Sequence, residues 1–461
     1  MFKKVLIASR GEIAVRIIRT LKEMGIYSIA VYSQADMSSL PVRLADKAVC
    51  IGPASAAKSY LNADAIISAA KITGAEAIHP GYGFLSENAD FAEACAESGI
   101  TFIGPYPETM RQLGDKAAAR RLAIKAAIPV TPGTKGCVSP ENALEEARKI
   151  GFPIMLKAAA GGGGKGIRIS YSEADLLHEY QIASSEAMAA FGNGSLYFEK
   201  YIQAPRHIEI QFVRDSHGNV MTFPERDCSI QRRHQKLIEE TPSPAVSEEL
   251  RSKLRNAACM LAEQSGYMGA GTVEFLLDKN GNYWFMEVNA RLQVEHPVTE
   301  AITGHDIVRE QILAAAGLSL SGDSLRGNNL KVNQIHVPHY GHAFELRINA
   351  ENPAENFRPC PGKIKSLSMP GGPGIRIDTH IYAGYSMPVY YDSLMAKIIV
   401  CAQDRQTAIA RAKRSLTELE AEGIQTTSTI FFDILDDEDF KTGKTSTDFV
   451  EKMLADKHKK Q

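Results

Sequence analysis

The stretch KKVLIASRGEIAVRIIRTLKEMGIYSIAVYS, residues 3–33, decides the fold class of the first part of the chain. It opens with the apolar run KKVLIAS and closes with SIAVYS, both typical of buried strands. Between them, residues 12–25 carry apolar side chains at helical spacing from Ile13 to Met24, which predicts an amphipathic helix ending at Gly25. A strand, a helix and a second strand in this order predict a βαβ unit in a parallel sheet.

The same alternation continues in AEAIHP at residues 75–80 and ITFIGP at residues 100–105. We therefore expect a doubly wound α/β domain over residues 1–114. Such a domain often binds a dinucleotide, but that function needs several glycines after the first strand so that the backbone can approach a pyrophosphate. The turn ASRGEI at residues 8–13 has one glycine, so we set a dehydrogenase aside.

The bulk composition favours an ordinary globular enzyme of about three domains, because 461 residues exceed what one core usually supports. The 52 basic and 54 acidic side chains nearly balance, so nothing indicates nucleic-acid binding. Seven cysteines are scattered singly, which favours a reduced, cytoplasmic protein. The first apolar run is interrupted by Arg10 and Glu12, unlike a signal peptide, and no run reaches the length of a membrane span.

A predicted hairpin, GTVEFLLDKNGNYWFMEVN at residues 271–289, indicates a metal site. If Asn280-Gly281 forms a two-residue loop, Glu274 lies directly opposite Glu287. The Cβ atoms of cross-strand partners lie roughly 4.5–5.5 Å apart, so two carboxylates there repel each other. A cation is therefore expected between them. Asn289 shares the face of Glu287, and this oxygen-rich set suits Mg²⁺ or Mn²⁺. The alternative is a half-exposed strand with ordinary polar residues outside.

Two further segments have the residue types of an anion-binding site. FPIMLKAAAGGGGKGIRIS, residues 152–170, places a run of glycines between strand-like sequences, where backbone N–H groups can close over phosphates; a flexible linker is the alternative. Downstream of a predicted strand, PRHIEIQFV, the segment at residues 232–236 gathers Arg232, Arg233, His234 and Lys236. Such a cluster can bind phosphate or bicarbonate. Taken alone, it favours the alternative interpretation, a run of charged side chains exposed to solvent. If the strand after residue 289 stays extended, Arg291, Gln293 and Glu295 lie on the metal-binding face.

Taken together, these phrases identify a family. HPGYGFLSENA, GDKAAAR, LKAAAGGGGKG, PRHIEIQ, ERDCSIQRRHQK, EVNARLQVEHPVTE, LRINAE and YYDS span nearly the whole chain, which resembles biotin carboxylase of the ATP-grasp superfamily. The resemblance implies an α/β protein with three domains. These are an N-terminal domain at 1–114, an ATP-grasp domain at 115–330 with a mobile lid at about 130–204, and a C-terminal α/β domain at 331–450. Residues 451–461 are expected to be a frayed tail.

The resemblance also implies the role of each candidate site residue. ATP would be surrounded by Lys116, Lys157, Gly163, Gly164, Glu199, Lys200, Ile202, His207, His234, Glu274 and Glu287. The metal would be held by Glu274, Glu287 and Asn289, and bicarbonate by Lys236, Arg291, Gln293 and Val294. Glu295 would be the general base, and Arg347 would bind biotin and stabilise its enolate. The catalytic set is then Lys236, Arg291, Glu295 and Arg347.

By this resemblance the chain carboxylates biotin on a biotin carboxyl carrier protein, using ATP and bicarbonate through carboxyphosphate. It would supply the first half-reaction of a biotin-dependent carboxylase, such as acetyl-CoA carboxylase in fatty acid synthesis. The expected partners are the carrier, carboxyltransferase subunits and a second copy in a homodimer. No Met-Lys-Met phrase occurs, so biotin is expected on a separate protein.

Two alternatives stay open at this stage: another ATP-grasp carboxylate–amine ligase, and a catalytically silent subunit that binds nucleotide only. The second would be expected to lack Lys236, Arg291 or Glu295, and all three are present. The chain also departs from the family pattern at Ser9, at Asp448, and by about ten extra residues between Gly317 and Gly341.

Overall fold

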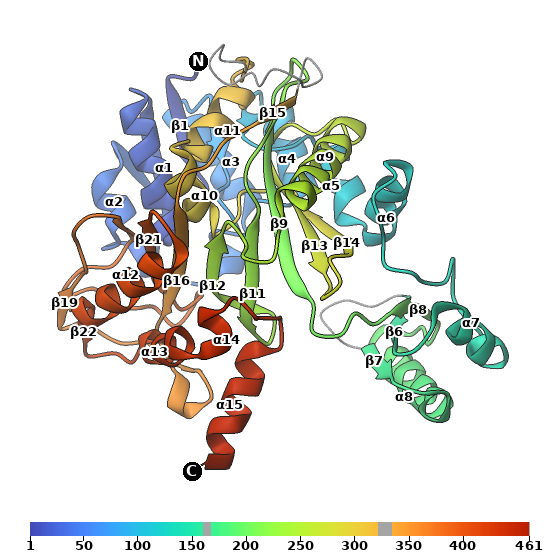
Figure 1. Cartoon of the computed structure of the whole chain (residues 1–461). Helices are drawn as coiled ribbons and strands as arrows, with labels where there is room; N and C mark the ends of the chain where they lie inside the picture. Colours follow the sequence, from blue (N-terminus) through green and yellow to red (C-terminus); the bar gives the residue numbers. More distant parts are fainter. Residues whose placement is uncertain (160–166, 321–333, 461) are drawn as a thin grey trace. The chain divides into compact units, whose positions relative to one another are not determined.

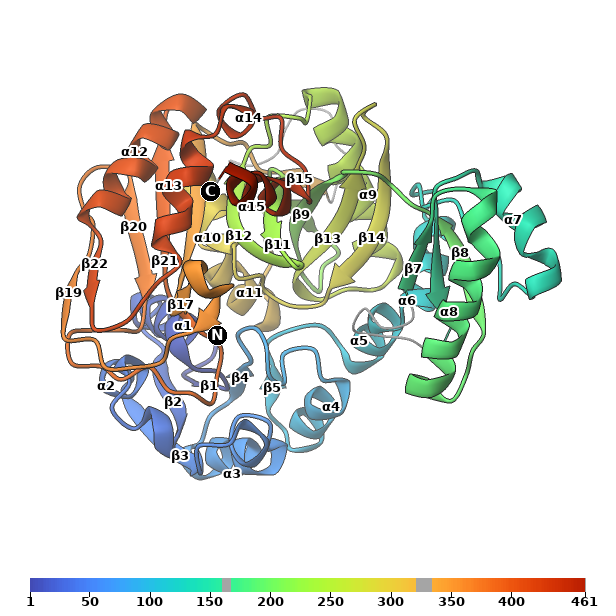
Figure 2. The same ribbon diagram turned by 90° about the horizontal axis from the view of Figure 1, so that it is seen from below.

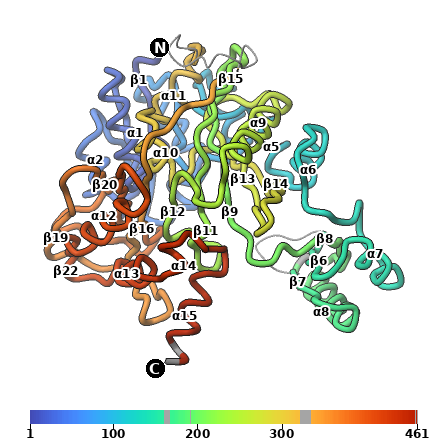
Figure 3. Tube along the Cα trace, viewed as in Figure 1, coloured from blue at the N-terminus to red at the C-terminus, as the bar shows by residue number. Residues whose placement is uncertain are grey.

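The computed structural model describes residues 1–159, 167–320 and 334–460. Figure 1 colours them along the chain, and Figure 3 traces the same path as a tube. They divide into two compact units, each described here by itself: unit 1 comprises 1–126, 206–275 and 287–461, and unit 2 comprises 127–205 and 276–286. The predicted phosphate-binding Gly163 and Gly164, and residues 321–333 of the extra segment, lie outside the described residues.

The start of the chain forms the predicted doubly wound domain. Its five parallel strands are ordered β3-β2-β1-β4-β5, with bounds β1 Lys4–Ile7, β2 Tyr27–Ser33, β3 Lys47–Gly52, β4 Ala77–His79 and β5 Thr101–Phe102. Its helices are α1 Gly11–Glu23, α2 Leu40–Leu44, α3 Ala63–Thr73, α4 Ala89–Glu97 and α5 Pro107–Gly114. The apolar side chains of Ile13, Ile17 and Leu21 on α1 are buried as their spacing predicted. Strand β3 was not predicted, because KAVCIG is half-exposed and mixes polar with apolar residues.

A larger, mostly antiparallel sheet holds most of the candidate site residues. Its main path runs β14-β13-β9-β11-β12-β16-β21-β20; off this path, β10 pairs with β9, and β15 pairs with β10. The bounds are β9 Arg206–Arg214, β10 Val220–Thr222, β11 Arg226–Arg232, β12 Gln235–Thr241, β13 Gly269–Leu277, β14 Tyr283–Asn289, β15 Gln334–His336, β16 His342–Asn349, β20 Ile375–Thr379 and β21 Leu394–Ala402. Strand β9 confirms the strand predicted from PRHIEIQFV.

Helices cover both faces of this sheet in unit 1. Helix α12 packs on β16 and β21 from one side, and α10 packs on β12, β16 and β21 from the other (Figure 2). The helices are α6 Lys116–Lys125, α9 Glu248–Gln264, α10 His296–Thr303, α11 Ile307–Ala315, α12 Arg405–Glu418, α13 Ser428–Asp436, α14 Glu438–Lys441 and α15 Phe449–Lys460. The short strands are β17 Glu351–Asn352, β18 Arg358–Pro359, β19 Ser366–Ser368 and β22 Glu420–Glu422.

Side-chain alternation along β16 divides the two faces chemically. Phe344 and Leu346 join the apolar core beneath α12. Glu345 and Arg347, one residue further in each case, must then lie on the opposite face of the strand. That face therefore carries charges inside the protein.

Unit 2 is built on a three-stranded antiparallel sheet in the order β7-β6-β8. Its elements are β6 Ile154–Ala158, β7 Ile167–Ser170, β8 Leu196–Lys200, α7 Ala143–Ile150 and α8 Glu173–Phe191. The two strands predicted on either side of the glycine run are thus confirmed as β6 and β7, which pair antiparallel. Within the described part of the chain, no helix combines the length and the apolar character that crossing a bilayer requires.

Candidate active site

The turn between β13 and β14 has three loop residues, so the expected two-residue loop is wrong. The N–H of Asp278 donates to the carbonyl of Asn282 at 2.9 Å, and the N–H of Gly281 donates to the carbonyl of Asp278 at 3.2 Å. The Asp278 carboxylate also accepts from the N–H groups of Asn280 and Asn282, each at 2.8 Å. This Asx-type bonding closes the loop one residue earlier than the Asn-Gly pattern predicts, and Lys279 belongs to the loop.

Two of the three predicted metal ligands, Glu274 and Asn289, are in contact within unit 1. Asn289 Nδ2 donates to Glu274 Oε1 at 2.8 Å, so these two side chains are in contact. Glu287 precedes Asn289 by two residues on β14 and shares its face; its carboxylate lies 3.4 Å from Lys116 Nζ. The shifted turn removes the argument that set Glu287 directly opposite Glu274. Two carboxylates and one amide remain a donor set that fits a hard divalent cation.

The chain turns after Asn289 instead of continuing as a strand, which corrects the expectation of extended geometry through Glu295. The turn brings the side chains together by another route. Arg291 Nη1 donates to Gln293 Oε1 at 3.0 Å, and Gln293 Nε2 donates to Glu274 Oε1 at 3.2 Å. Glu295 ends the turn immediately before α10.

Glu295 lies at the centre of a buried cluster of charges and is itself fully buried. Lys236 Nζ donates to its Oε1 at 2.5 Å, and Arg347 Nη2 donates to its Oε2 at 2.9 Å. Burial alone would raise the pKa of Glu295, but the charges of Lys236 and Arg347 outweigh it and hold the pKa well below the usual range. The structure thus offers an ionised carboxylate with a cation on each oxygen.

Lys236 connects Glu295 to the neighbouring strands. Its Nζ lies 2.8 Å from Glu209 Oε2 on β9 and 3.4 Å from Glu274 Oε1 on β13. Burial would lower the pKa of Lys236, but the acidic groups around it raise that pKa well above its usual value. His207 Nε2 lies 3.0 Å from Glu274 Oε2. Burial opposes the charge on His207, yet Glu274 raises the pKa of the imidazole overall.

Three buried charged residues of this cluster were not foreseen from the sequence: Glu209, Glu239 and Lys397. Glu239 pairs with Arg347, and Lys397 Nζ donates to the carbonyl of Val294 at 2.8 Å. The only available signal was a single charge inside an apolar strand, as in LMAKIIV around Lys397. Such a signal does not say which strand lies alongside.

His234 lies apart from this cluster in the structure, exposed in the two-residue turn between β11 and β12. Arg233 and His234 have φ values of 48° and 65°, the left-handed region of a type I′ turn that usually takes glycine or asparagine. The N–H of Arg233 donates to Glu451 Oε1 on α15 at 2.9 Å. Lys457 on the same helix pairs with Asp433. These contacts explain why residues 451–460 are helical and not the frayed tail that was expected.

The remaining described candidates belong to unit 2. Lys157 on β6 and Glu199 on β8 form an ion pair. Lys200 Nζ donates to two backbone carbonyls at 2.8 and 2.7 Å. Ile202 follows β8 and is half-buried. The structure therefore brings Lys157 together with Glu199 and holds the Lys200 side chain on the backbone carbonyls of Gly151 and Phe152.

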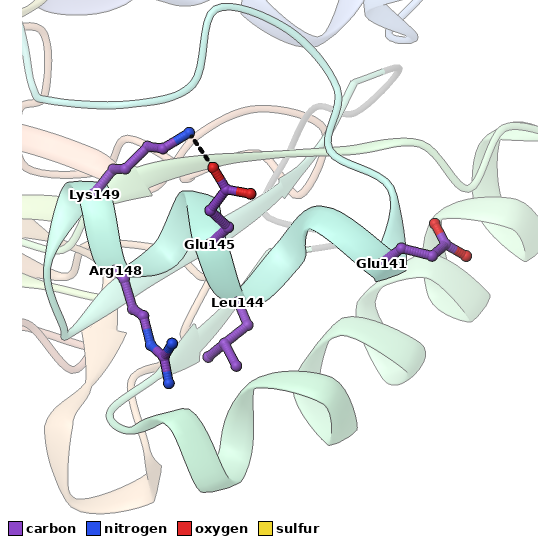
Figure 4. Close-up of a pocket in the computed structure, with 5 residues that line it drawn as sticks. All are labelled: Glu141, Leu144, Glu145, Arg148 and Lys149. Carbon is purple, nitrogen blue, oxygen red and sulfur yellow. Dashed lines mark ion pairs between the residues drawn. The ribbon is translucent and has the colours of Figure 1, made fainter.

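A hollow on α7 contains none of the candidate residues. Figure 4 shows it lined by Glu141, Leu144, Glu145, Arg148 and Lys149. Lys149 lies 2.9 Å from Glu145, and Arg148 lies 2.7 Å from Glu173. These are exposed ion pairs of the kind that surfaces commonly carry, so we assign the hollow no function.

Known proteins match nearly the whole chain. Residues 1–110 match the family model "Biotin carboxylase, N-terminal domain", residues 115–322 match "Carbamoyl-phosphate synthase L chain, ATP binding domain", and residues 345–452 match "Biotin carboxylase C-terminal domain". The chain is 51% identical to biotin carboxylase 1 of Bacillus subtilis over 453 residues, 98% of each protein.

Two solved structures have the same fold over nearly their full length. The biotin carboxylase of Campylobacter jejuni, described as a beta-gamma-ATP complex, is 47% identical with a TM-score of 0.89, covering 98% of this chain and 99% of that one. The biotin carboxylase domain dimer of Hydrogenobacter thermophilus 2-oxoglutarate carboxylase, in complex with MgADP, ADP and bicarbonate, is 45% identical with a TM-score of 0.87, covering 98% of each chain. The chain therefore belongs to the biotin carboxylase family and is an ADP-forming ligase of the ATP-grasp class.

Proposed function

We propose that this chain carboxylates the biotin of a separate carrier protein, using ATP and bicarbonate. The observation that carries the proposal is Glu295, buried and ionised between Lys236 and Arg347. A carboxylate can take the proton of bicarbonate, and the cations beside it can bind the bicarbonate anion. Nucleotide binding alone does not need this arrangement.

In the proposed first step, Lys236, Arg291, Gln293 and the Val294 backbone hold bicarbonate beside Glu295. The O–H bond of bicarbonate breaks, its proton passes to Glu295, and the freed oxygen attacks the γ-phosphate of ATP. Carboxyphosphate and ADP result. A divalent cation on Glu274, Glu287 and Asn289 would supply neutralisation of the phosphate charge. The oxygen donors present fit Mg²⁺ or Mn²⁺.

In the second step, carboxyphosphate breaks down to CO₂ and phosphate, and that phosphate takes the proton from the ureido nitrogen of biotin. Negative charge then develops on the ureido oxygen, and Arg347 is placed to stabilise it. Arg347 is held at Glu295, so the proposed base of the first step and the proposed cation of the second are in contact. The proposal also assigns ATP binding to Lys116, Lys157, Gly163, Gly164, Glu199, Lys200, Ile202, His207 and His234.

The finer assignments belong to the same proposal. We infer three domains, at 1–114, at 115–330 with a lid at about 130–204, and at 331–450. We also infer that the chain forms a homodimer. Its proposed partners are a biotin carboxyl carrier protein and carboxyltransferase subunits. We favour acetyl-CoA carboxylase of fatty acid synthesis as the complete enzyme, although one similar structure is the biotin carboxylase domain of a 2-oxoglutarate carboxylase. All seven cysteines are free, which supports a reducing, cytoplasmic setting.

Bicarbonate-dependent ADP release, measured with and without free biotin, tests the proposal. Strong stimulation by biotin is the expected result. Stimulation by an amine substrate and not by biotin would assign the chain to another carboxylate–amine ligase. Nucleotide binding without any ADP release would mean a silent subunit.

A further inference from the structure

Two carboxylates face each other beside Arg347, and the proposed reaction gives neither of them a role. Glu239 on β12 and Glu345 on β16 are direct cross-strand partners, and both are fully buried. Arg347 follows Glu345 by two residues and so shares its face. Arg347 Nη2 forms an ion pair with Glu239 Oε1 as well as with Glu295 Oε2. One guanidinium nitrogen therefore holds two carboxylates from different elements.

Burial and mutual repulsion raise the pKa values of both facing carboxylates. Burial raises the pKa of Glu345 well above its usual value, and the charge of Glu239 adds to that effect. Within the described residues, the carboxylate oxygens of Glu345 and of Glu239 have no hydrogen-bond partner, and Glu239 contacts Arg347 as an ion pair. Burial also raises the pKa of Glu239, but Arg347 opposes the rise and the pKa lies at about 7. Glu239 is therefore about half ionised at pH 7 and carries the negative charge that faces Arg347 as the pH rises above that value.

The proposed first step removes one of the two anions that hold Arg347. When Glu295 takes the proton of bicarbonate, its carboxyl becomes neutral and its attraction for the guanidinium weakens. Glu239 then remains the ionised partner of Arg347. An arginine that is released by one carboxylate and still held by the other can turn its guanidinium toward the developing enolate without leaving its position.

We propose that Glu239 is a positioning residue for the second half-reaction: it holds the Arg347 guanidinium in place while Glu295 carries the proton taken from bicarbonate. This inference rests on the proposed function and adds a residue to it. It assigns Glu239 no contact with biotin or bicarbonate. Its effect reaches the reacting atoms through Arg347 alone.

The surroundings of Glu239 give the proposal a pH dependence. The charged or titratable groups that act on it are Lys236 on its own strand, Cys228 on β11, Glu345 and Arg347 on β16, and Glu295 before α10. As the pH falls below about 7, Glu239 gains a proton and its hold on Arg347 weakens. Biotin carboxylation should then fall relative to ATP cleavage.

The test measures two rates in each variant at several pH values: carboxybiotin formation, and bicarbonate-dependent ADP release without biotin. Their ratio cancels effects on the bicarbonate step. We expect Glu239→Gln to lower the ratio at pH 8 by about tenfold or more, because the buried ion pair with Arg347 is lost. The ratio should also lose its fall between pH 8 and 6. Glu239→Asp keeps the charge, so it should recover part of the ratio.

Glu240→Gln is the matched control. Glu240 is the next residue of β12 and is equally buried, but it faces the other side of the sheet, where it lies 2.7 Å from Arg405 Nε and 3.0 Å from His342 Nε2. This variant should lower the melting temperature and leave the ratio unchanged. If Glu239→Gln does not fold, Glu239→Asp still decides: the midpoint of the ratio should move to lower pH, because aspartate has the lower ordinary pKa.

An unchanged ratio and pH profile in folded Glu239→Gln would overturn the inference, as would an equal loss of both rates. In Glu239→Asp, an unmoved midpoint would do the same. Failure of the proposed function is distinguishable, because the unaltered chain would then show no biotin-stimulated ADP release at all.

Discussion

Replacing Arg347 by alanine should separate the two half-reactions. The guanidinium lies 2.9 Å from a carboxylate oxygen of Glu295, and we take that distance as the approach of an enolate oxygen. At 2.9 Å, unit charges attract by about 6 kcal/mol at an effective dielectric constant of about 20, and by about 1.4 kcal/mol in water. The difference, about 4 kcal/mol, corresponds to roughly a thousandfold loss of biotin carboxylation. Losses on the order of 10²–10³ are typical when one charge-stabilising group is removed.

ATP cleavage should survive the same change. The charge of Arg347 is one cause of the low pKa of Glu295, so its removal raises that pKa and makes the proposed base stronger. Paired measurements of ADP and carboxybiotin check this, with Arg405→Ala as the control because it removes a guanidinium from Glu240 on the opposite face of the sheet. Equal loss of both products in a folded Arg347→Ala variant would refute the assignment and place Arg347 in the ATP step.

Three other changes have defined outcomes. Glu295→Ala removes the proposed base and should abolish both ADP release and carboxybiotin formation, whereas retained ADP release would exclude Glu295 as the base. Glu287→Gln should raise the Mg²⁺ concentration needed for half-maximal turnover with little change in melting temperature; an unchanged Mg²⁺ dependence contradicts its role as a ligand. Burial lowers the pKa of His380 to about 3 from 6.5, so the folded state loses about 1.4 kcal/mol per pH unit as the pH falls from 6.5 towards 3. His380→Asn should flatten that loss in thermal denaturation, and an identical pH profile would contradict it.

The spacing of apolar residues predicted those helices and strands whose formation depends on their own segment of sequence. The spacing from Ile13 to Leu21 predicted the buried face of α1, and the run PRHIEIQFV predicted strand β9. The turn length was missed because the Asp278 side chain, and not the Asn-Gly backbone preference, closes the loop. A side chain that bonds to the backbone two and four residues ahead is a weaker sequence signal than a glycine.

The centre of the site depends on pairings between distant strands. Glu239 meets Arg347 because β12 lies beside β16, and the sequence of one strand does not say which strand pairs with it. The residue roles assigned to Lys236, Glu295 and Arg347 came from family resemblance, and the structure brings these three side chains into contact. The sequence therefore identified the proposed catalytic residues, but it did not identify Glu209 and Glu239, the buried acidic residues that contact them.

The contact between the Arg233-His234 turn and Glu451 has a practical consequence for handling the protein. The turn holds two non-glycine residues in left-handed backbone geometry, and α15 supports it through one side-chain acceptor. Helix α15 ends at Lys460, next to the last residue of the sequence. A purification tag or fusion partner joined there is attached to the element that supports His234. Affinity handles for nucleotide-binding measurements are therefore better placed at the other end of the chain or removed by cleavage before assay.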